Sequence, residues 1–480
     1  MAPKYIIKNA TVLSVDETIG NIHNCDVLIE DGIIKAVGPN LNHSDHAIID
    51  GTDAIVSPGF IDTHRHTWQT QLRTLCTDFV LSDYLLNIRH IYGSCYSVED
   101  TYLGNYCGAL ESIDNGITYL IDHSHIMNSP DHADAAIKGL RDAKIRGTFC
   151  YGFYANPAWA GSNVDPEREK DVEWRLTDAR RAREAHFPSN APDQLLRFGV
   201  APSEAEAIPF EELLHQIETA RSIGAAIITA HIALGKFDGG HFMTRRFGEL
   251  DLLGSDFLWS HANSLTDDEM DLVKKYDLGL SSTPEIEMQM GVGYPIAYKA
   301  KEHGLRVGLG VDITSNCPGD MFQQMRLVLQ AQRYEDQRKS PFPLPMARPC
   351  AEVLEMATMG GARAVGLEKI IGSITPGKRA DLIITKCDST RLTPVHEPVA
   401  ALVNYANGSD IDTVMVNGEI LKSGGKLVNV DWPKIRAEVR KSAARIMAMS
   451  KLAPRDQLED ARNAMVSAVA MAREKIAAPA

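Results

Sequence analysis

The sequence predicts an α/β protein: a (β/α)8 barrel of the TIM type, with a small β-sandwich formed by both ends of the chain. Two observations support this fold. Short apolar runs alternate eight times with longer segments of helical periodicity, and β-type alternation both precedes and follows that region. The repeats span about 250 residues, which suits a closed parallel barrel. An open, doubly wound sheet has the same repeat pattern and is the structural alternative.

The two ends of the chain carry the β-sandwich pattern. In residues 1–57, apolar and polar residues alternate in short runs separated by Gly and Asp turns. The pattern returns in residues 368–430, in segments such as ADLIITK and DTVMVNG. We expect these two parts to form one unit, with the barrel at 58–367 inserted between them. Residues 431–480 are rich in Ala, Arg, Glu and Met and are expected to form a helical tail.

Eight barrel strands are predicted between amphipathic segments such as PFEELLHQIETARSIG, whose apolar residues recur at helical spacing. The strands are expected at 56–62, 116–122, 145–152, 195–202, 225–231, 257–261, 278–282 and 306–312. In a parallel barrel the C-terminal ends of all strands meet at one face, which carries the active site. Side chains at these ends are therefore the candidates for function.

Composition narrows the class of partner. The net charge of −14 repels phosphate backbones, so nucleic acid is not an expected partner. No apolar run is long enough to cross a bilayer, and the N-terminus lacks the apolar core of a signal peptide. The eight cysteines include no CxxC pair, which favours reduced thiols in a cytoplasmic protein. We expect a soluble intracellular protein without a membrane partner.

Histidines and one aspartate are predicted to converge at the barrel mouth. His64 and His66 end the first strand, where alternate residues point to the same side. His231, His261 and Asp312 end the fifth, sixth and eighth strands. Imidazole nitrogens and carboxylates are zinc ligands, so this convergence predicts a metal centre. Three other histidines fall outside the pattern and are interpreted as solvated or structural residues: His241, His303 and His396.

The chain resembles the amidohydrolase superfamily, in the branch that holds cytosine, guanine and 8-oxoguanine deaminases and the triazine hydrolases. The resemblance covers nearly the whole chain and rests on four segments: SPGFIDTHRH, HANSLTDDEM, GLGVDITSN and ATMGGARAVGLEKIIGSITPGKRADLIITK. It implies hydrolysis of a C–N bond in a small cyclic or heteroaromatic compound through a metal-activated water. The reaction would be deamination, or opening of a cyclic amide or amidine.

The resemblance also implies roles for the matched residues. His64, His66, His231 and Asp312 would bind one divalent metal ion, which is zinc or alternatively iron. Asp312 would take a proton from the attacking water as general base, and His261 would orient that water or polarise the bond under attack. One ion is favoured over two, because binuclear relatives usually place a modified lysine at the fourth strand, where this chain has no lysine.

One position departs from the family pattern. Deaminases of this branch usually carry a proton-transferring glutamate three residues after the fifth-strand histidine, and here that residue is Leu234. Ammonia is a poor leaving group that needs help from a general acid. Four groups near the predicted mouth are candidates to replace the glutamate: Glu285, Glu287, His123 and His125.

Three further residues are candidate substrate contacts. Trp68 and Gln69 follow the HxH motif directly, although Trp68 is equally well interpreted as a core aromatic. Glu204 follows the fourth strand, where binuclear relatives have their bridging carboxylate.

Other functions remain open at this point. The barrel could be a hydrolytic dehalogenase of a heteroaromatic compound, or a metal-dependent decarboxylase or lyase. A catalytically silent barrel used for assembly is a further alternative, which the intact set of metal ligands disfavours.

The C-terminal tail carries apolar residues near one helical stripe: Leu458, Ala461, Met465, Val469 and Met471. We expect this helix to pack on its own barrel or against a second subunit in a homo-oligomer.

Overall fold

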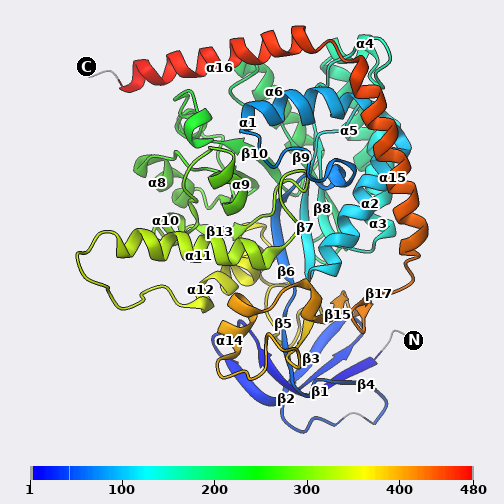
Figure 1. The fold of residues 1–480 in the computed structure, drawn as a ribbon, viewed down its shortest axis with the longest axis vertical. Coiled ribbons are helices and arrows are strands. Elements are labelled where there is room, and N and C mark those ends of the chain that lie inside the picture. Colours follow the sequence, from blue (N-terminus) through cyan, green and yellow to red (C-terminus); the bar gives the residue numbers. More distant parts are fainter. Residues whose placement is uncertain (1–3, 43, 478–480) are drawn as a thin grey trace.

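In this computed structural model, residues 4–42 and 44–477 are described, and they form a barrel with a second sheet at one end (Figure 1). The barrel has eight parallel strands, adjacent in sequence order from first to last. They are β6 (Phe60–Arg65), β7 (Ile117–Ser124), β8 (Arg146–Gly152), β9 (Leu196–Ala201), β10 (Ile228–Ile232), β11 (Phe257–His261), β12 (Gly279–Ser282) and β13 (Arg306–Leu309). The predicted (β/α)8 barrel is confirmed.

The ring closes where the first strand meets the segment after the last. The backbone N–H of Asp312 donates to the carbonyl of His64, and the N–H of His66 donates to the carbonyl of Asp312, both at 2.8 Å. Arg65 and Asp312 form the corresponding parallel bridge. Three predicted metal ligands therefore belong to the seam that closes the barrel.

The second sheet draws on both ends of the chain, as predicted. Strand β5 (Ala54–Pro58) pairs in parallel with β1 and antiparallel with β14, which joins the N-terminal strands to the C-terminal ones. Apolar residues such as Val27, Val56 and Leu382 form its core. The remaining strands are β1 (Lys4–Leu13), β2 (Asn21–Glu30), β3 (Ile33–Gly38), β4 (Ala47–Asp50), β14 (Leu382–Lys386), β15 (Ile411–Val416), β16 (Glu419–Ser423) and β17 (Lys426–Leu427).

Amphipathic helices cover the barrel, and some of them begin at a side-chain cap. Helix α2 begins after Ser97, whose hydroxyl accepts from the N–H of Asp100 while the Asp100 carboxylate accepts from the N–H of Ser97. The larger helices are α2 (Val98–Asp114), α3 (Pro130–Asp142), α5 (Glu173–His186), α6 (Phe210–Ser222), α8 (Asp267–Lys275) and α11 (Met321–Gln337). The shorter ones are α1 (Leu81–Tyr84), α4 (Pro166–Lys170), α7 (Met243–Glu249), α9 (Pro284–Gln289), α10 (Ala297–Glu302), α12 (Cys350–Glu355), α13 (Gly361–Ala364) and α14 (Pro398–Ala400).

Irregular helical turns line the connections near the strand ends. After β6 the chain passes through the 3-10 turn η1 (Thr67–Leu72), α1 and the π-helix η2 (Leu85–Tyr92). After β10 it forms the 3-10 turn η4 (Gly235–Phe237). The other turns are η3 (Gly93–Cys95), η5 (Met356–Gly360), η6 (Ala401–Tyr405), η7 (Gly408–Asp410) and η8 (Ser450–Leu452).

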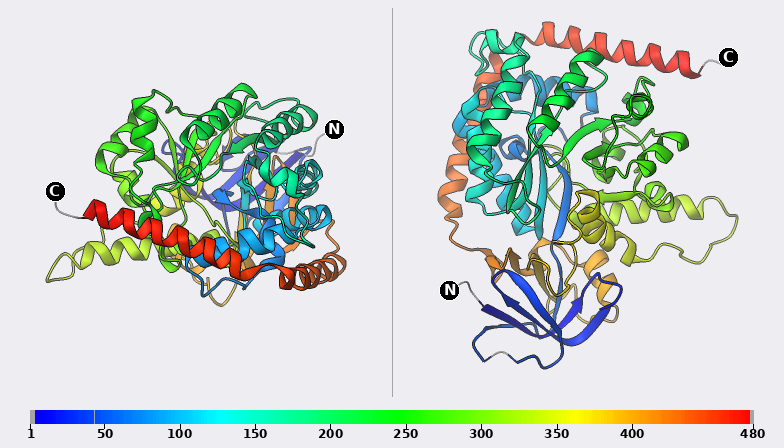
Figure 2. Two further views of the ribbon diagram at one scale, coloured as in Figure 1. Left: turned by 90° about the horizontal axis from the view of Figure 1, so that it is seen from above. Right: turned by 180° about the vertical axis from the view of Figure 1, so that it is seen from behind.

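The C-terminal tail is helical, as its composition indicates. Helix α15 (Trp432–Met449) runs along the side of the barrel, and α16 (Arg455–Ala477) then crosses the barrel end that lies away from the second sheet (Figures 1 and 2). Across the described ranges, no helix combines the length and apolar character needed to span a membrane. All eight cysteines are free thiols, and six of them are buried.

Candidate active site

The strand ends turn sharply where they present functional side chains. His261 ends β11 with φ 71°, and Asp312, which follows β13, also has φ 71°. This left-handed region is unfavourable for residues with a Cβ, at about 1–3 kcal/mol each. Such strain is concentrated at functional sites because the surrounding structure holds it in place. Here it directs both side chains into the barrel mouth.

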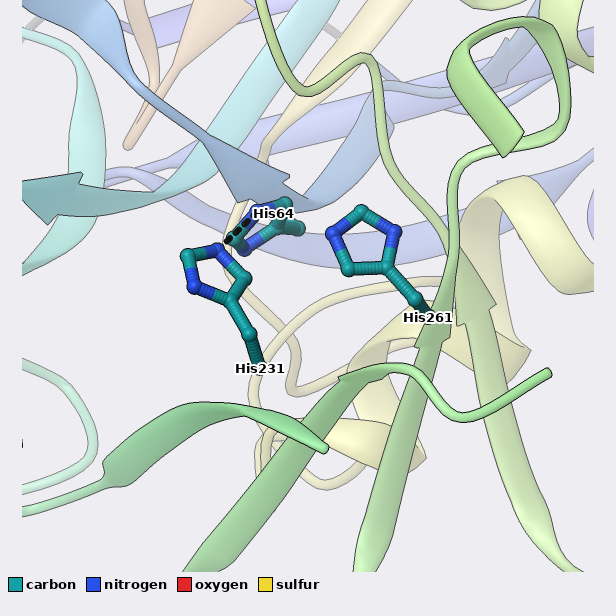
Figure 3. A group of neighbouring side chains, drawn as sticks. All are labelled: His64, His231 and His261. Carbon is teal, nitrogen blue, oxygen red and sulfur yellow. Dashed lines mark hydrogen bonds between the residues drawn. The ribbon is translucent and has the colours of Figure 1, made fainter. Parts of the chain in front are cut away.

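Four side chains place possible ligand atoms close to one another. Nε2 of His64 lies 3.3 Å from Nε2 of His231 and 3.5 Å from Oδ1 of Asp312, and Nε2 of His66 lies 3.3 Å from the same oxygen. Ligands about 2.1 Å from a tetrahedral zinc ion stand roughly 3.4 Å apart. The spacing of these atoms therefore fits a single metal ion. Figure 3 shows the rings of His64, His231 and His261 around this common space.

Each predicted histidine ligand is oriented through its other nitrogen. Nδ1 of His66 donates to the carbonyl of His123 at 2.7 Å, and Nδ1 of His231 donates to the carboxylate of Glu204 at 3.0 Å. Nδ1 of His64 hydrogen-bonds the hydroxyl of Ser260 at 2.9 Å. A donor at Nδ1 leaves the lone pair on Nε2 free, and such partners are typical of metal sites.

The electrostatics favour ligands in their metal-binding protonation states. Burial lowers the pKa of His64 to about 4, and it lowers the pKa of His66 well below the usual range. Burial alone would raise the pKa of Asp312, but hydrogen bonding and charge from His64 lower it below its ordinary value. Neutral imidazoles and an ionised carboxylate are the forms that bind a divalent cation.

His261 is held by a different set of partners. Its Nδ1 lies 3.0 Å from the hydroxyl of Thr283 and 3.7 Å from the carboxylate of Glu287, while its Nε2 lies 3.8 Å from Asp312. Burial lowers the pKa of His261, but Glu287 and Asp312 raise it to a net value above the ordinary one. His261 therefore stands beside the ligand cluster as a potential hydrogen-bond donor.

A pocket of about 410 Å³ opens above this cluster. Its polar wall includes His66, His231, His261, Asp312 and Glu204. The remaining wall is largely apolar and includes Leu234, the residue at the expected glutamate position. A pocket of this size and character suits a small ring compound.

Comparisons with known proteins agree with this geometry. Residues 55–421 match the model of the amidohydrolase family. The chain belongs to this family. It is 28% identical over 454 residues to a 5′-deoxyadenosine deaminase of Methanosarcina barkeri, covering 92% of this chain and 98% of that protein.

Two solved structures share the fold of this amidohydrolase. An adenosine deaminase of Xanthomonas campestris with bound zinc matches with a TM-score of 0.79 at 20% identity, over 93% of this chain and 99% of the other. A triazine hydrolase from Arthrobacter aurescens matches with a TM-score of 0.81 at 20% identity, over 92% and 99%. The expected hydrolysis of a C–N bond in a small heteroaromatic compound is confirmed by the family and its deaminase members.

The four candidates for a replacement proton carrier lie in different surroundings. Glu285 accepts a hydrogen bond from Gln324 of α11 at 3.0 Å and does not line the pocket. Glu287 is fully buried, where Ser282 and the backbone N–H of Thr283 donate to its carboxylate. It does not line the pocket, and its carboxylate lies 3.7 Å from Nδ1 of the lining residue His261.

The two histidines of β7 also differ. His123 is fully buried, hydrogen-bonds the hydroxyl of Tyr154 at 2.9 Å and stacks on the ring of His231. His125 lines the pocket and groups with His66 and His231 as a possible ligand set. Burial lowers the pKa of both His123 and His125 well below the usual range. Of the four candidates, only His125 reaches the pocket.

The candidate substrate contacts after the HxH motif lie behind the pocket wall. Trp68 is fully buried, and its indole N–H donates to Nδ1 of His125 at 3.3 Å. The amide of Gln69, also fully buried, donates to the hydroxyl of Tyr84 at 2.8 Å. Both residues support side chains that line the pocket, whereas Glu204 lines it directly.

Four residues that line the pocket are not among the site residues predicted from the sequence. Arg89 and Tyr84 come from the long connection after β6, and Glu206 follows Glu204 by two positions. His241, which we interpreted as solvated or structural, also lines the pocket. Burial and the neighbouring Asp238 raise the pKa of Glu206 to about 8. Only Glu206 had a usable signal, since it lies beyond the same strand end as Glu204.

Proposed function

We propose that this amidohydrolase is a deaminase, which replaces an amino group on a heteroaromatic ring with oxygen and releases ammonia. His64, His66, His231 and Asp312 would hold one divalent ion, with zinc as the expected metal. The observation that carries the proposal is the spacing of these four ligands, 3.3–3.5 Å between the measured pairs, at the floor of the pocket. The deaminase name of the Methanosarcina relative and the zinc in the Xanthomonas neighbour support it.

The proposed reaction assigns separate roles to the metal ion, Asp312 and His261. When bound, the ion supplies a Lewis acid that lowers the pKa of water towards neutrality. Asp312 accepts a proton from the attacking water, because its low pKa keeps it ionised and it lies at the pocket floor. His261, held by Thr283 and Glu287, donates a hydrogen bond that orients the attacking group.

Leu234 stands where related deaminases have a proton-transferring glutamate, and leucine cannot carry a proton. Glu204 is our candidate for this role. It lines the pocket, and its carboxylate lies 3.0 Å from Nδ1 of the predicted ligand His231. Burial raises the pKa of Glu204, but His231 and Arg89 lower it to a net value below the ordinary one. An ionised carboxylate there can accept a proton and pass it to the leaving amine. His125 is the alternative carrier on the same wall.

The experiment that tests this function has two parts. Elemental analysis of purified protein should find about one divalent ion per chain, as expected from one ligand set. A screen of aminopurines, aminopyrimidines, aminotriazines and deoxyadenosine analogues should then detect ammonia release that depends on that ion. Full activity in a metal-free preparation would exclude the mechanism.

Hydrolytic dehalogenation is the second candidate function. The apolar Leu234 in the pocket wall favours it, because halide leaves without a proton. The same screen with chlorinated triazines separates the two reactions, since chloride release without ammonia release would favour this candidate.

We further propose a cytoplasmic homo-oligomer that works without nucleic acid or a membrane. Eight free thiols fit a reducing compartment, and a net charge of −14 disfavours binding to phosphate backbones. Light scattering of the purified protein measures the mass of the assembly directly.

A further inference from the structure

The last helix of the chain forms part of the pocket wall. Four residues of α16 line the pocket: Met465, Ala468, Val469 and Ala472. They recur at the spacing i, i+3, i+4 and i+7, which places them on one face of the helix. A segment far from the metal ligands in sequence therefore faces the same space as His231 and Asp312.

Polar anchors hold α16 across the barrel end. Arg462 forms an ion pair with Asp83 of α1 at 2.6 Å. Farther along the helix, Arg473 donates to the carbonyl oxygen of Gly235 in η4 at 2.6 Å. The helix thus bridges the connection after β6 and the connection after β10, on both sides of the lining residues (Figures 1 and 2).

The lining face of α16 borders open space instead of a packed core. Met465 is 38% exposed, and Val469 is half-buried. Other apolar side chains complete this part of the pocket: Leu81, Leu85, Phe237 and Met290. An apolar group that entered this space would remove the surface of both walls from water, which favours binding.

We propose that Met465 and Val469 determine substrate specificity by binding an apolar substituent of the ring that this enzyme hydrolyses. The inference rests on the proposed function, because it takes the reacting carbon to lie at the His64–Asp312 cluster. The substituent then extends from the ring to α16. The substrate class is an amino-substituted heteroaromatic compound with an aliphatic or aryl group.

A series of unreactive ligands tests this directly. 1-Methyl-, 1-butyl- and 1-hexylbenzimidazole lack a leaving group and differ only in their apolar chain. Titrated calorimetrically into metal-loaded protein, they should bind more tightly by up to about fourfold for each methylene. In the double variant Met465→Ala/Val469→Ala this gain with chain length should fall by half or more, while the methyl compound binds as before.

The matched control changes the same helix outside the pocket. Val466 and Met471 are 38% and 58% exposed and do not line the pocket, so Val466→Ala/Met471→Ala should keep the wild-type gain. A second pair tests the opposite change. Ala468→Trp should weaken the hexyl compound at least tenfold and the methyl compound less than twofold, whereas the outward Ala470→Trp should change neither.

Two results would overturn the inference. Wild-type binding could be independent of chain length, or the pocket-face variants could weaken all three ligands equally. The proposed function fails separately, through the metal content and ammonia release of the wild-type protein. A chain-length effect in a protein without ammonia release would leave the α16 site standing and remove only the deaminase assignment.

Discussion

Glu204 lines the pocket, and its carboxylate hydrogen-bonds a predicted metal ligand at the ring nitrogen that does not face the metal site. Its partner is Nδ1 of His231, at 3.0 Å. Glutamine at this position keeps an oxygen that can accept the same hydrogen bond. It cannot carry a proton, however, so this substitution separates orientation of the ligand from proton transfer.

We therefore expect Glu204→Gln to lower kcat by roughly 10²- to 10⁴-fold while the metal content is unchanged. Glu285→Gln serves as the control, because Glu285 bonds Gln324 outside the pocket. Single-turnover kinetics with metal analysis provides both readouts. A Glu204→Gln rate within a few-fold of wild type would transfer the role to His125.

Glu206 gives a pH dependence of stability. Its pKa rises from 4.5 to about 8 on folding, so the folded state holds a proton that the unfolded state releases between these values. Stability must then fall as pH rises from about 4.5 to about 8. Glu206→Gln should flatten this part of the Tm profile and raise Tm relative to wild type near pH 8. An unchanged slope would show that Glu206 is ionised in the folded protein.

For single residues, the sequence predicted which ones lie near the barrel mouth better than it predicted the direction in which their side chains point. His64, His66, His231, His261 and Asp312 were identified because parallel strand ends must meet at one face. Glu285 and Glu287 could not be separated in advance. They lie two residues apart on α9, roughly 200° around its axis, so only the docking of that helix decides which carboxylate turns inward.

At the scale of elements, the backbone is tightly packed where β6 meets the segment that follows β13. A Cβ on Gly310 would lie 2.9 Å from the backbone nitrogen and oxygen of His64. The two segments approach this closely because the backbone N–H of Asp312 donates to the carbonyl of His64 and the carbonyl of Asp312 accepts from the N–H of His66. A side chain at Gly310 must therefore displace either His64, a proposed metal ligand, or the backbone of Gly310 itself.

We expect Gly310→Ala to destabilise the protein and to lower its metal affinity at least tenfold. Gly38→Ala is the control, since a Cβ there meets only one side-chain atom, at 3.9 Å. Equilibrium metal titration and a thermal melt of each variant give the comparison. Wild-type metal affinity in Gly310→Ala would show that the seam can move apart without cost to the site.

The sequence predicted the barrel strands but not the location of the last helix. The barrel strands were predictable because each is a short apolar run between amphipathic helices. The place of α16 was not, since an apolar stripe on a helix indicates that it packs but not against what. The sequence is compatible with packing on its own barrel or on a second subunit, and the structure places Met465 and Val469 over the pocket of the same chain.

For the molecule as a whole, the four proposed metal ligands come from distant parts of one ring. His64 and His66 come from the first strand, His231 from the fifth, and Asp312 from beyond the last. An ion bound to all four would stabilise only the folded state. We therefore expect the free energy of unfolding to increase with the concentration of the metal ion.

Removal of the metal with a chelator should lower Tm by several degrees, and added zinc should restore it. At free metal about 1000-fold above Kd the linkage contributes about 4 kcal/mol. Differential scanning calorimetry over a range of zinc concentrations tests the dependence. His64→Asn should show little response to zinc, and a Tm independent of zinc in wild type would contradict a site formed by these residues.

The pairing of β5 with β14 has a consequence for synthesis of the chain. During translation β5 leaves the ribosome first, and its C-terminal neighbour follows roughly 320 residues later, which takes about 15–65 s at usual rates. Throughout that time one edge of the N-terminal strands is open to other chains. Yield in cells should therefore depend on chaperones that shield nascent strands more than on the stability of the finished protein.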